Sequence, residues 1–214
     1  MRILIVSATA QETDPIAATL QRFSGHHIDR LVTGVGMVAT AARCAQVLIK
    51  EPYDLALNLG VCGSFDPALA PGAVVHVSTD RIADLGAEDG DAFLTIQQMN
   101  LLGDDEFPFS GGRLVNAQPP AGAALARLPA VDGITVNTAH GNARSIAAVT
   151  ARWAPQVESM EGAAFMYCCL IHGVTFAQVR AVSNVVETRN RAAWKMAEAI
   201  DGLTRTALSI LEQA

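Results

Sequence analysis

Residues 157–191 read V-E-S-M-E-G-A-A-F-M-Y-C-C-L-I-H-G-V-T-F-A-Q-V-R-A-V-S-N-V-V-E-T-R-N-R. They begin with two acids, Glu158 and Glu161, and continue through an uncharged run that a His-Gly pair interrupts. Phe176–Val182 has the length and the β-branched content of a buried strand. We therefore expect a helix after Glu161, then a strand that ends at Ser183-Asn184. Because ligands of open α/β sheets bind at the carboxyl ends of strands, the acid and the amide are expected to line one pocket.

The composition fits an α/β protein with a large buried core. The chain has 214 residues, of which 50% are hydrophobic, 17% charged and 5% aromatic. A core of Ala, Val, Leu and Ile suits a sheet that helices cover on both faces, and a chain of this length can bury one such core. No linker, repeat or low-complexity tract interrupts it, so we expect one domain over residues 1–214.

The net charge of −6 is concentrated in one segment. Residues 78–112 contain eight acids and one base, and the remainder is close to neutral. The chain has no basic stripe that could follow a phosphate backbone, which excludes the usual nucleic-acid binders. The acidic segment shows little regular period. We expect it to be a loop that covers the pocket or contacts a second subunit, with a solvated surface excursion as the alternative.

Cysteine spacing and hydropathy indicate the compartment. The four cysteines show no Cys-x-x-Cys spacing, so we expect buried free thiols in the reducing cytoplasm. Residues 162–179 carry no formal charge and approach the length of a membrane span. However, His172-Gly173 and Gln178 interrupt this run, and a helix followed by a strand explains it better. We expect no membrane segment.

The N-terminal part predicts two more strands that end at the same edge. Short apolar runs at Ile3–Val6 and Leu55–Leu59 are typical of buried parallel strands. Asp14-Pro15 forms a suitable start for a helix reaching about Phe23. Glu12 would then lie in the turn after the first strand, at the carboxyl edge of the sheet.

Two glycine-containing stretches approach nucleotide-binding motifs without fitting them. Residues 34–39 match G-x-G-x-x-A, but they follow the second expected strand, His27–Val32, and no acid ends the next strand. We expect a tight turn before a helix over Met37–Lys50, with a non-catalytic nucleotide-binding module as the alternative. Gly60–Ser64, expected to be a loop, lacks the Lys-Ser/Thr of a P-loop.

Two motifs resemble the nucleoside phosphorylase and nucleosidase family. S-M-E-G-A-A at 159–164 precedes V-R-A-V-S-N at 179–184, in the order in which the family carries a Met-Glu pair on the ribose and a Ser-Asp or Ser-Asn pair on the purine. The resemblance covers nearly the whole chain. It implies a three-layer α/β/α fold around a mixed, largely parallel sheet. It also implies an enzyme that uses no cofactor or metal, acts on a small nucleoside and forms a homo-oligomer of two or more chains.

The resemblance assigns roles to residues at the expected pocket. Glu12 would activate water near the anomeric carbon, Glu161 would hold the ribose hydroxyls, and Asn184 would steady the departing purine. The structural alternatives are a solvated Glu12 at a helix N-terminus and an Asn184 that only caps its strand. Family members commonly have Glu-Met-Glu where this chain has Ser-Met-Glu, so the role of the first acid stays open between two neighbours. The other expected substrate contacts are Met160, Ser159 (or Glu158 in its place), Gly63, His140 and Ser183.

Three positions indicate the reaction and the base. Asn58 and Val61 stand where related phosphorylases carry an arginine and a serine that bind phosphate, and neutral groups bind a dianion less strongly. Asn184 offers both a donor and an acceptor, which suits hypoxanthine better than adenine. We expect hydrolysis of the N-glycosidic bond of a hypoxanthine nucleoside. The alternatives within the family are a methylthioadenosine/adenosylhomocysteine nucleosidase and a purine nucleoside phosphorylase.

The segment after the Ser-Asn pair indicates the 5′ group of the substrate. Residues 183–191, with Trp194 beyond them, look most like the branch of the family whose substrate carries a benzoate at the ribose 5′ end. Arginine binds a carboxylate through two parallel donors. The resemblance therefore implies that Arg189 or Arg191 holds this group. The alternative is that both face solvent or pair with Glu187 and Glu198.

Overall fold

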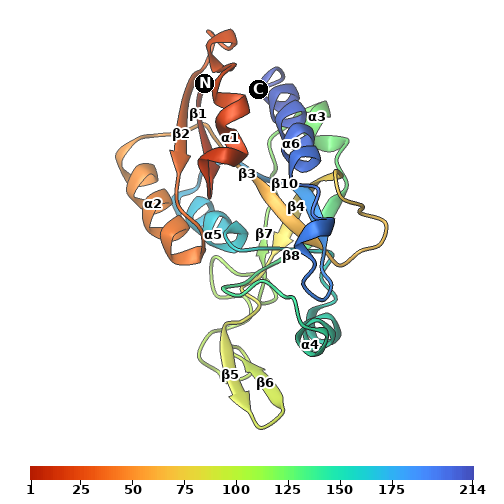
Figure 1. The fold of residues 1–214 in the computed structure, drawn as a ribbon. Coiled ribbons are helices and arrows are strands. Elements are labelled where there is room, and N and C mark those ends of the chain that lie inside the picture. The colour runs from red at the N-terminus through yellow and green to blue at the C-terminus, as the bar shows by residue number, and fades with distance from the viewer.

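A mixed sheet forms the centre of the computed structural model, which describes residues 1–214 (Figure 1). The strand order is β10-β4-β8-β9-β3-β1-β2, and β7 pairs with the far part of β4. Five of the pairings are parallel (β1–β2, β1–β3, β3–β10, β4–β8 and β8–β9) and three are antiparallel (β4–β10, β3–β9 and β4–β7). The expected mixed, largely parallel sheet is confirmed. The strands are β1 (Arg2–Ser7), β2 (His27–Val32), β3 (Leu55–Ser64), β4 (Val74–Asp80), β7 (Leu114–Val115), β8 (Ala130–Thr135), β9 (Val157–Ser159) and β10 (Phe176–Val185).

Part of this sheet closes on itself. Strand β3 pairs with both β9 and β10, so β10, β4, β8, β9 and β3 form a ring. A cluster of buried side chains receives a member from every strand of this ring. Val75, Val77, Val131, Val157 and Val182 are the valines of this cluster. Their β-branched side chains suit the pleated surface of a closely packed strand.

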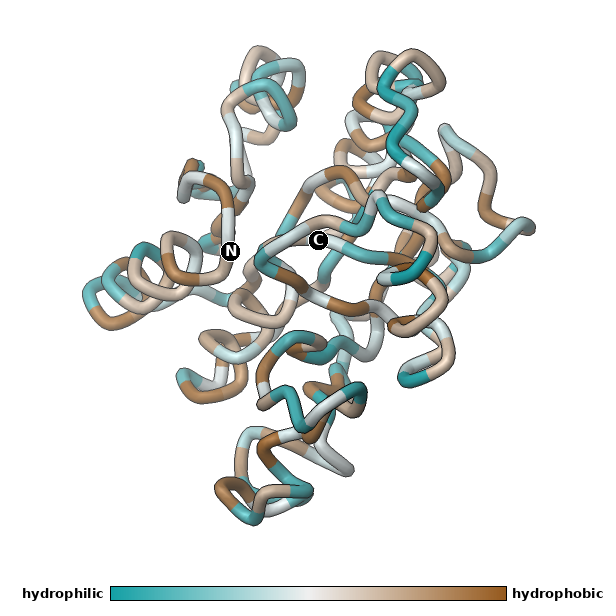
Figure 2. The backbone as a smooth tube through the Cα atoms, turned by 60° about the horizontal axis from the view of Figure 1, so that its bottom comes forward, coloured by the Kyte–Doolittle hydropathy of each residue, from teal (hydrophilic) through white to brown (hydrophobic).

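Helices cover the sheet on two sides and produce the three expected layers (Figure 1). One apolar cluster packs α1, α3 and α6 against the sheet, and a second packs α2 and α5. Figure 2 shows hydrophobic and hydrophilic positions alternating along the outer helices, as amphipathic helices require. The helices are α1 (Ala10–Ala17), α2 (Met37–Lys50), α3 (Ala123–Ala126), α4 (Ala143–Trp153), α5 (Gly162–His172) and α6 (Met196–Leu211), with 3-10 turns η1 (Leu20–Arg22) and η2 (Arg191–Ala193).

The start of α1 differs from the expectation. The helix begins at Ala10 with Thr9 as its N-cap, so Asp14-Pro15 lies inside it, and it ends at Ala17. The cause is a capping box in which the carboxylate of Glu12 accepts the backbone N–H of Thr9. This contact makes Glu12 a helical residue instead of a turn residue.

Three strand boundaries also differ from the expectation. Strand β3 continues to Ser64, so the expected loop over Gly60–Ser64 is extended backbone between β10 and β9. Strand β10 runs on past Asn184 to Val185, with a register shift after Val182. The apolar pattern at Ile134–Thr138 also predicts a strand, but strand β8 runs from Ala130 to Thr135. Pairing with neighbours that are distant in sequence decides these ends.

The acidic segment is more regular than expected. It contains the end of β4 and a two-stranded hairpin of β5 (Gly86–Asp89) and β6 (Ala92–Thr95), which extends away from the sheet (Figure 1). None of residues 78–112 lines the central cavity described below, so the expectation that they cover it is wrong. A contact with a second subunit stays a prediction.

The uncharged run over residues 162–179 divides between α5 and the first residues of β10. No helix of the chain combines the length and the apolar character needed to span a membrane. All four cysteines are buried and free. The two chain termini lie at the same end of the molecule (Figure 1).

Candidate active site

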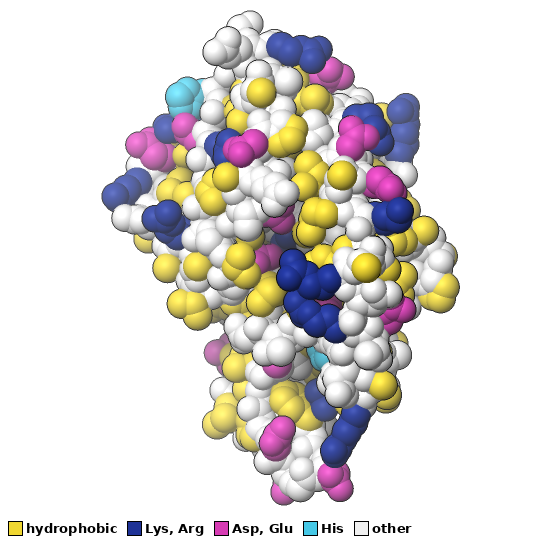
Figure 3. Space-filling model, viewed as in Figure 1, with side chains coloured by type: hydrophobic (Ala, Val, Ile, Leu, Met, Phe, Trp, Pro, Cys, Tyr) yellow, Lys and Arg dark blue, Asp and Glu magenta, His cyan; other side chains and the backbone are white.

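A cavity of about 290 Å³ opens where several strands of the central sheet end. Its walls come from the carboxyl ends of β3, β9 and β10 and from the segments that follow β1 and β8, as expected for an α/β sheet. Figure 3 shows basic side chains gathered over the middle of this face, with acidic side chains recessed beside them. Nine of the ten predicted site residues line the cavity: Glu12, Gly63, His140, Ser159, Met160, Glu161, Ser183, Asn184 and Arg189. Arg191 is the exception.

Glu12 is buried and rigidly held. One carboxylate oxygen accepts the backbone N–H and the hydroxyl of Thr9, at 2.8 and 3.0 Å, and the other accepts the N–H of Val61 at 3.2 Å. Only 7% of the residue is exposed, so the alternative of a solvated acid is wrong. Three donors from α1 and β3 thus fix both oxygens at the cavity wall, with lone pairs left for a further ligand.

Glu161 lies on the other side of the site, at the start of α5. One oxygen accepts the N–H of Gly36 at 3.1 Å, and the other lies 3.7 Å from the guanidinium of Arg180. Gly36 has a φ of 97°, a conformation that L side chains rarely adopt. The glycine turn before α2 therefore presents its amide to the second catalytic candidate, and the resemblance to a dinucleotide motif has a structural explanation.

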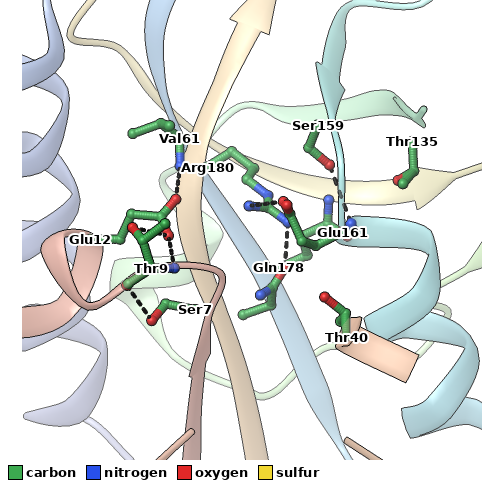
Figure 4. Close-up of polar contacts among 12 residues, drawn as sticks. Ser7, Thr9, Glu12, Thr40, Val61, Thr135, Ser159, Glu161, Gln178 and Arg180 are labelled. Carbon is green, nitrogen blue, oxygen red and sulfur yellow. Dashed lines mark hydrogen bonds and ion pairs between the residues drawn. The ribbon is translucent and has the colours of Figure 1, made fainter. Parts of the chain in front are cut away.

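Arg180 is the main component of the site that we did not single out from the sequence. Its side chain is 1% exposed, although it lies within an apolar strand, and its Nη2 donates to Oδ1 of Asn58 at 2.5 Å. Figure 4 shows Glu12 and Glu161 on opposite sides of this guanidinium. A charged side chain inside a buried strand requires partners. The arginine between Val179 and Ala181 was therefore a sequence signal that an anionic or polar group lies near this strand.

Space for Arg180 comes from Gly60, its register partner on β3. A Cβ at this glycine would lie 2.2 Å from Nη1 of Arg180 and 3.0 Å from Oε1 of Glu12. Asn58 is 1% exposed and does not line the cavity, so of the two positions compared with phosphorylases only Val61 faces it. The side-chain oxygen of Asn58 instead accepts a hydrogen bond from the guanidinium of Arg180.

Glu158 and Ser159, between which the role of the first acid stays open, have different partners. Glu158 is buried and accepts the backbone N–H of His140 at 3.0 Å, and its other oxygen lies 2.6 Å from Nδ1 of the same histidine. Ser159 accepts the N–H of Gly162 at 3.3 Å and so stabilises the first turn of α5. Glu158 therefore orients a cavity histidine, and Ser159 supports the helix that carries Glu161.

Asn184 lies at the cavity in a locally bonded arrangement. Its amide nitrogen donates to the carbonyl oxygen of Val185 at 3.0 Å, and its oxygen accepts from the hydroxyl of Ser183 at 2.8 Å. Gly63 leaves room for this side chain, since a Cβ there would lie 3.3 Å from the amide nitrogen. The local bonds match the strand-cap alternative, but one amide hydrogen and one oxygen lone pair stay free for a ligand.

The two arginines near the C-terminus have different surroundings. Arg189 lines the cavity, and its backbone N–H donates to the carbonyl of Gly141, next to His140. Arg191 instead lies over the ring of Trp194, 5.9 Å from its centroid. The alternative pairing of these arginines with Glu187 and Glu198 is absent from the ion pairs of the structure, in which Lys195 pairs with Glu198.

Cys62 is the one thiol at the cavity wall. Burial raises the pKa of this thiol to about 12. The thiolate is the nucleophilic form of cysteine, so Cys62 is not positioned to attack a substrate at neutral pH. The carboxylates remain the candidates for acid–base chemistry at this site.

Comparison with known proteins identifies the family of the chain. Residues 16–212 match the family described as the phosphorylase superfamily. The chain belongs to the phosphorylase superfamily. It is 31% identical over 229 aligned positions to the futalosine hydrolase of Streptomyces coelicolor, with 95% of this chain and 92% of that protein covered.

Two solved structures support the fold. The native structure of the Helicobacter pylori futalosine hydrolase has a TM-score of 0.79 at 14% identity, covering 99% of this chain and 97% of that one. The Neisseria meningitidis 5′-methylthioadenosine/S-adenosylhomocysteine nucleosidase in complex with methylthio-immucillin-A has a TM-score of 0.77 at 16% identity, covering 99% and 98%. At these identities the likeness concerns the fold, not the substrate.

Proposed function

We propose that this chain, as one nucleoside phosphorylase-like domain over residues 1–214, hydrolyses the N-glycosidic bond of futalosine. The products would be hypoxanthine and dehypoxanthine futalosine, in a step of menaquinone biosynthesis that uses neither cofactor nor metal. The observation that carries the proposal is the meeting of Glu12, Glu161 and Asn184 in one cavity. The 31% identity to a futalosine hydrolase over most of both chains supports the choice of substrate.

The geometry supplies the groups that the reaction needs. As the bond between the anomeric carbon and the purine breaks, its electron pair leaves with the base and positive charge builds on the sugar. Glu161 would accept the ribose hydroxyls and face this charge, while Glu12 would orient a water and take its proton as the new C–O bond forms. Arg180 lies between the two acids, so its charge keeps them compatible in one buried site.

The charges of the cavity favour water over phosphate as the nucleophile. Four acids line it, and Arg189 is its single arginine or lysine. A phosphate dianion beside these carboxylates would be repelled. The N–H of Val61, which faces the cavity, already donates to Glu12.

The amide of Asn184 supports hypoxanthine as the departing base. Its second hydrogen can be donated to N7 or to the six-oxo oxygen, whereas adenine presents an amino group at the six-position. Arg189 supports the benzoate at the other end of the substrate, since it is the arginine at the cavity wall. Arg191, which lies on Trp194, would hold the loop.

We further propose a cytoplasmic homo-oligomer of two or more chains. Apolar side chains on α2 and α5 support the assembly, because Val38, Ile49 and Ile171 are well exposed. The four buried free thiols support a reducing compartment. Size-exclusion chromatography with light scattering would measure the mass of the protein in solution. A monomer at micromolar concentration would refute the proposed oligomer.

Product analysis tests the proposed reaction. The protein is incubated with futalosine, methylthioadenosine and inosine, each with and without phosphate, and the released base is identified by chromatography. We expect hypoxanthine from futalosine at a rate independent of phosphate. Faster release of adenine from methylthioadenosine would assign the nucleosidase activity, and a sugar 1-phosphate product would assign a phosphorylase.

A further inference from the structure

A fourth buried carboxylate lies behind the site and has no part in the proposed reaction steps. Asp80 is the last residue of β4, is 1% exposed and does not line the cavity. It accepts hydrogen bonds from three elements: the backbone N–H of Arg81, the hydroxyl of Thr135 and the amide of Gln178. Such an acid is costly to bury, so its contacts indicate what it does.

The first set of contacts connects Asp80 to the helix that carries Glu161. The hydroxyl of Thr135 lies 3.0 and 3.1 Å from the two oxygens of Asp80, and with its hydrogen donated there its oxygen accepts the N–H of Ala163 at 2.7 Å. Ala163 lies two residues after Glu161, in the first turn of α5. Figure 4 shows Thr135 on the side of Glu161 that faces away from Glu12.

Close packing reinforces this connection. Gly162 lies directly between Glu161 and Ala163, and a Cβ at this position would be 2.4 Å from Oδ2 of Asp80 and 2.2 Å from Nε2 of Gln178. The backbone that begins α5 therefore rests on the carboxylate itself. A displacement of Asp80 would be transmitted to Glu161 through one residue.

The second contact connects Asp80 to Gln178, which shares a strand with the arginine between the two acids. Nε2 of Gln178 donates to Oδ2 of Asp80 at 3.0 Å, which turns the amide oxygen away from the carboxylate. Gln178 and Arg180 are two residues apart on β10 and so lie on the same face. The buried Oε1 of Gln178 and the buried Nε of Arg180 have no hydrogen-bond partner. Because Asp80 binds the NH₂ group of Gln178, this partially positive group points away from the guanidinium of Arg180.

We propose that Asp80 is a positioning residue for the hydrolysis, because it sets the location of Glu161 through Thr135 and the start of α5 and that of Arg180 through Gln178. This inference rests on the proposed function, in which Glu161 binds the ribose. It assigns a role in activity to a residue that touches no substrate. Asp80 and Glu161 are 81 positions apart in the chain, and no local pattern connects them.

A role in stability alone does not account for this acid. Burial raises the pKa of Asp80 to about 6, even though the hydrogen bonds from Gln178 and Thr135 and the charge of Arg180 act in the opposite direction. The charged side chains that interact with it are Arg180 on β10 and the neighbouring Arg81. At neutral pH the fold thus holds a desolvated carboxylate, an arrangement that a neutral residue would make more stable.

The substitution Asp80→Asn separates the two roles. The oxygen of the new asparagine can still accept from Thr135 and Arg81. Its NH₂ group, however, needs an acceptor where Asp80 had one, so the amide of Gln178 must turn its oxygen toward the asparagine. The NH₂ group of Gln178 then points toward Arg180. We expect a melting temperature at pH 7.5 equal to or above that of the wild type. We also expect kcat/KM for base release to fall roughly 10- to 100-fold, the size of effect that a misplaced catalytic group produces.

Asp29→Asn is the matched control. Asp29 is also an aspartate with several donors, since it accepts from Arg2 and from the hydroxyl of Tyr53, but it lies on β2 and outside the cavity wall. This variant should lower the melting temperature and leave kcat/KM of the folded protein unchanged. The two aspartates should therefore show opposite patterns.

A double-mutant cycle tests the connection to Glu161 directly. Thr135→Val removes the bridging hydroxyl at nearly constant volume, and it provides the same test if Asp80→Asn does not fold. In the Asp80→Asn or the Thr135→Val background, Glu161→Gln should lower kcat/KM by a factor at least about tenfold smaller than in the wild type, because a misplaced Glu161 contributes less to the rate. Three outcomes would each overturn the inference. They are additive effects of the two substitutions in the cycle, an unchanged kcat/KM in Asp80→Asn, and a loss of kcat/KM that follows the melting temperature in both aspartate variants. A wild-type protein that releases no base from any nucleoside would instead refute the proposed function.

Discussion

A methyl group added at Gly60 should disable the site from within the sheet. In Gly60→Ala the new Cβ would lie 2.2 Å from Nη1 of Arg180, and ordinary van der Waals contact begins at 3.4 Å, so the guanidinium must move by about 1.2 Å. The side chain is buried on all sides, bound to Asn58 at 2.5 Å and placed 3.7 Å from Glu161. The same methyl group would lie 3.0 Å from the carboxylate of Glu12.

The magnitudes follow from this displacement. Overpacking by one methyl group in a close-packed core costs about 1–3 kcal/mol of unfolding free energy. A misplacement of about 1 Å in a catalytic arrangement costs on the order of 10²-fold in rate. We therefore expect Gly60→Ala to stay folded at 25 °C with a lowered melting temperature, and its kcat/KM for base release to fall by about two orders of magnitude.

Initial rates of base release and thermal unfolding by circular dichroism measure the two effects separately. Gly25→Ala is the control, because a Cβ at Gly25 would meet no atom within 4 Å. This variant should keep wild-type kcat/KM and a melting temperature at or above the wild-type value. If Gly60→Ala retained full kcat/KM, Arg180 would have no role in arranging the two acids, and the description of the site given above would be wrong.

Four further predictions concern individual residues. Glu12→Gln should keep the fold and lose about 10²- to 10⁴-fold in turnover, because an amide cannot take the proton of water; near-normal turnover with an intact melting transition would remove it from the mechanism. Asn184→Asp should disfavour hypoxanthine relative to adenine release by about 1–3 kcal/mol, since a carboxylate would face the carbonyl of Val185; an unchanged ratio of the two kcat/KM values would leave it a strand cap. Arg189→Met should raise KM for futalosine and spare any activity on inosine, whereas Arg191→Met should change neither KM; equal losses on both substrates would contradict this. The raised pKa of Asp80 should make the free energy of unfolding depend on pH, because the folded protein holds the protonated carboxyl more tightly than the unfolded chain does. This contribution should be fully present below about pH 4 and lost as the pH rises through about 6, a decrease of about 3 kcal/mol at ~1.4 kcal/mol per pH unit. Urea unfolding from pH 4 to 7 should show this decline in the wild type and a flatter profile in Asp80→Asn.

Local patterns determined much of the fold and the place of the site. Strand β2 and helix α2 have the predicted bounds, and α5 follows Glu161 as predicted, because their periodicity and their flanking glycines are contained within each segment. The polar residues that follow apolar runs marked the edge where the cavity lies. Nine of the ten predicted site residues line the cavity, and those at or after the ends of β1, β3 and β10 meet there because the carboxyl ends of parallel strands share one edge.

Tertiary structure decided how these residues are held. The amide of Gly36 on Glu161, the guanidinium of Arg180 beside it and the carboxylate of Asp80 behind α5 join segments that lie up to 125 positions apart. The ends of β3 and β10 were likewise set by each other, since backbone groups continue a strand wherever a neighbour pairs with them. Burial is the physical reason in each case: a charge removed from water must find a partner, and only the packed chain determines which partner lies within reach.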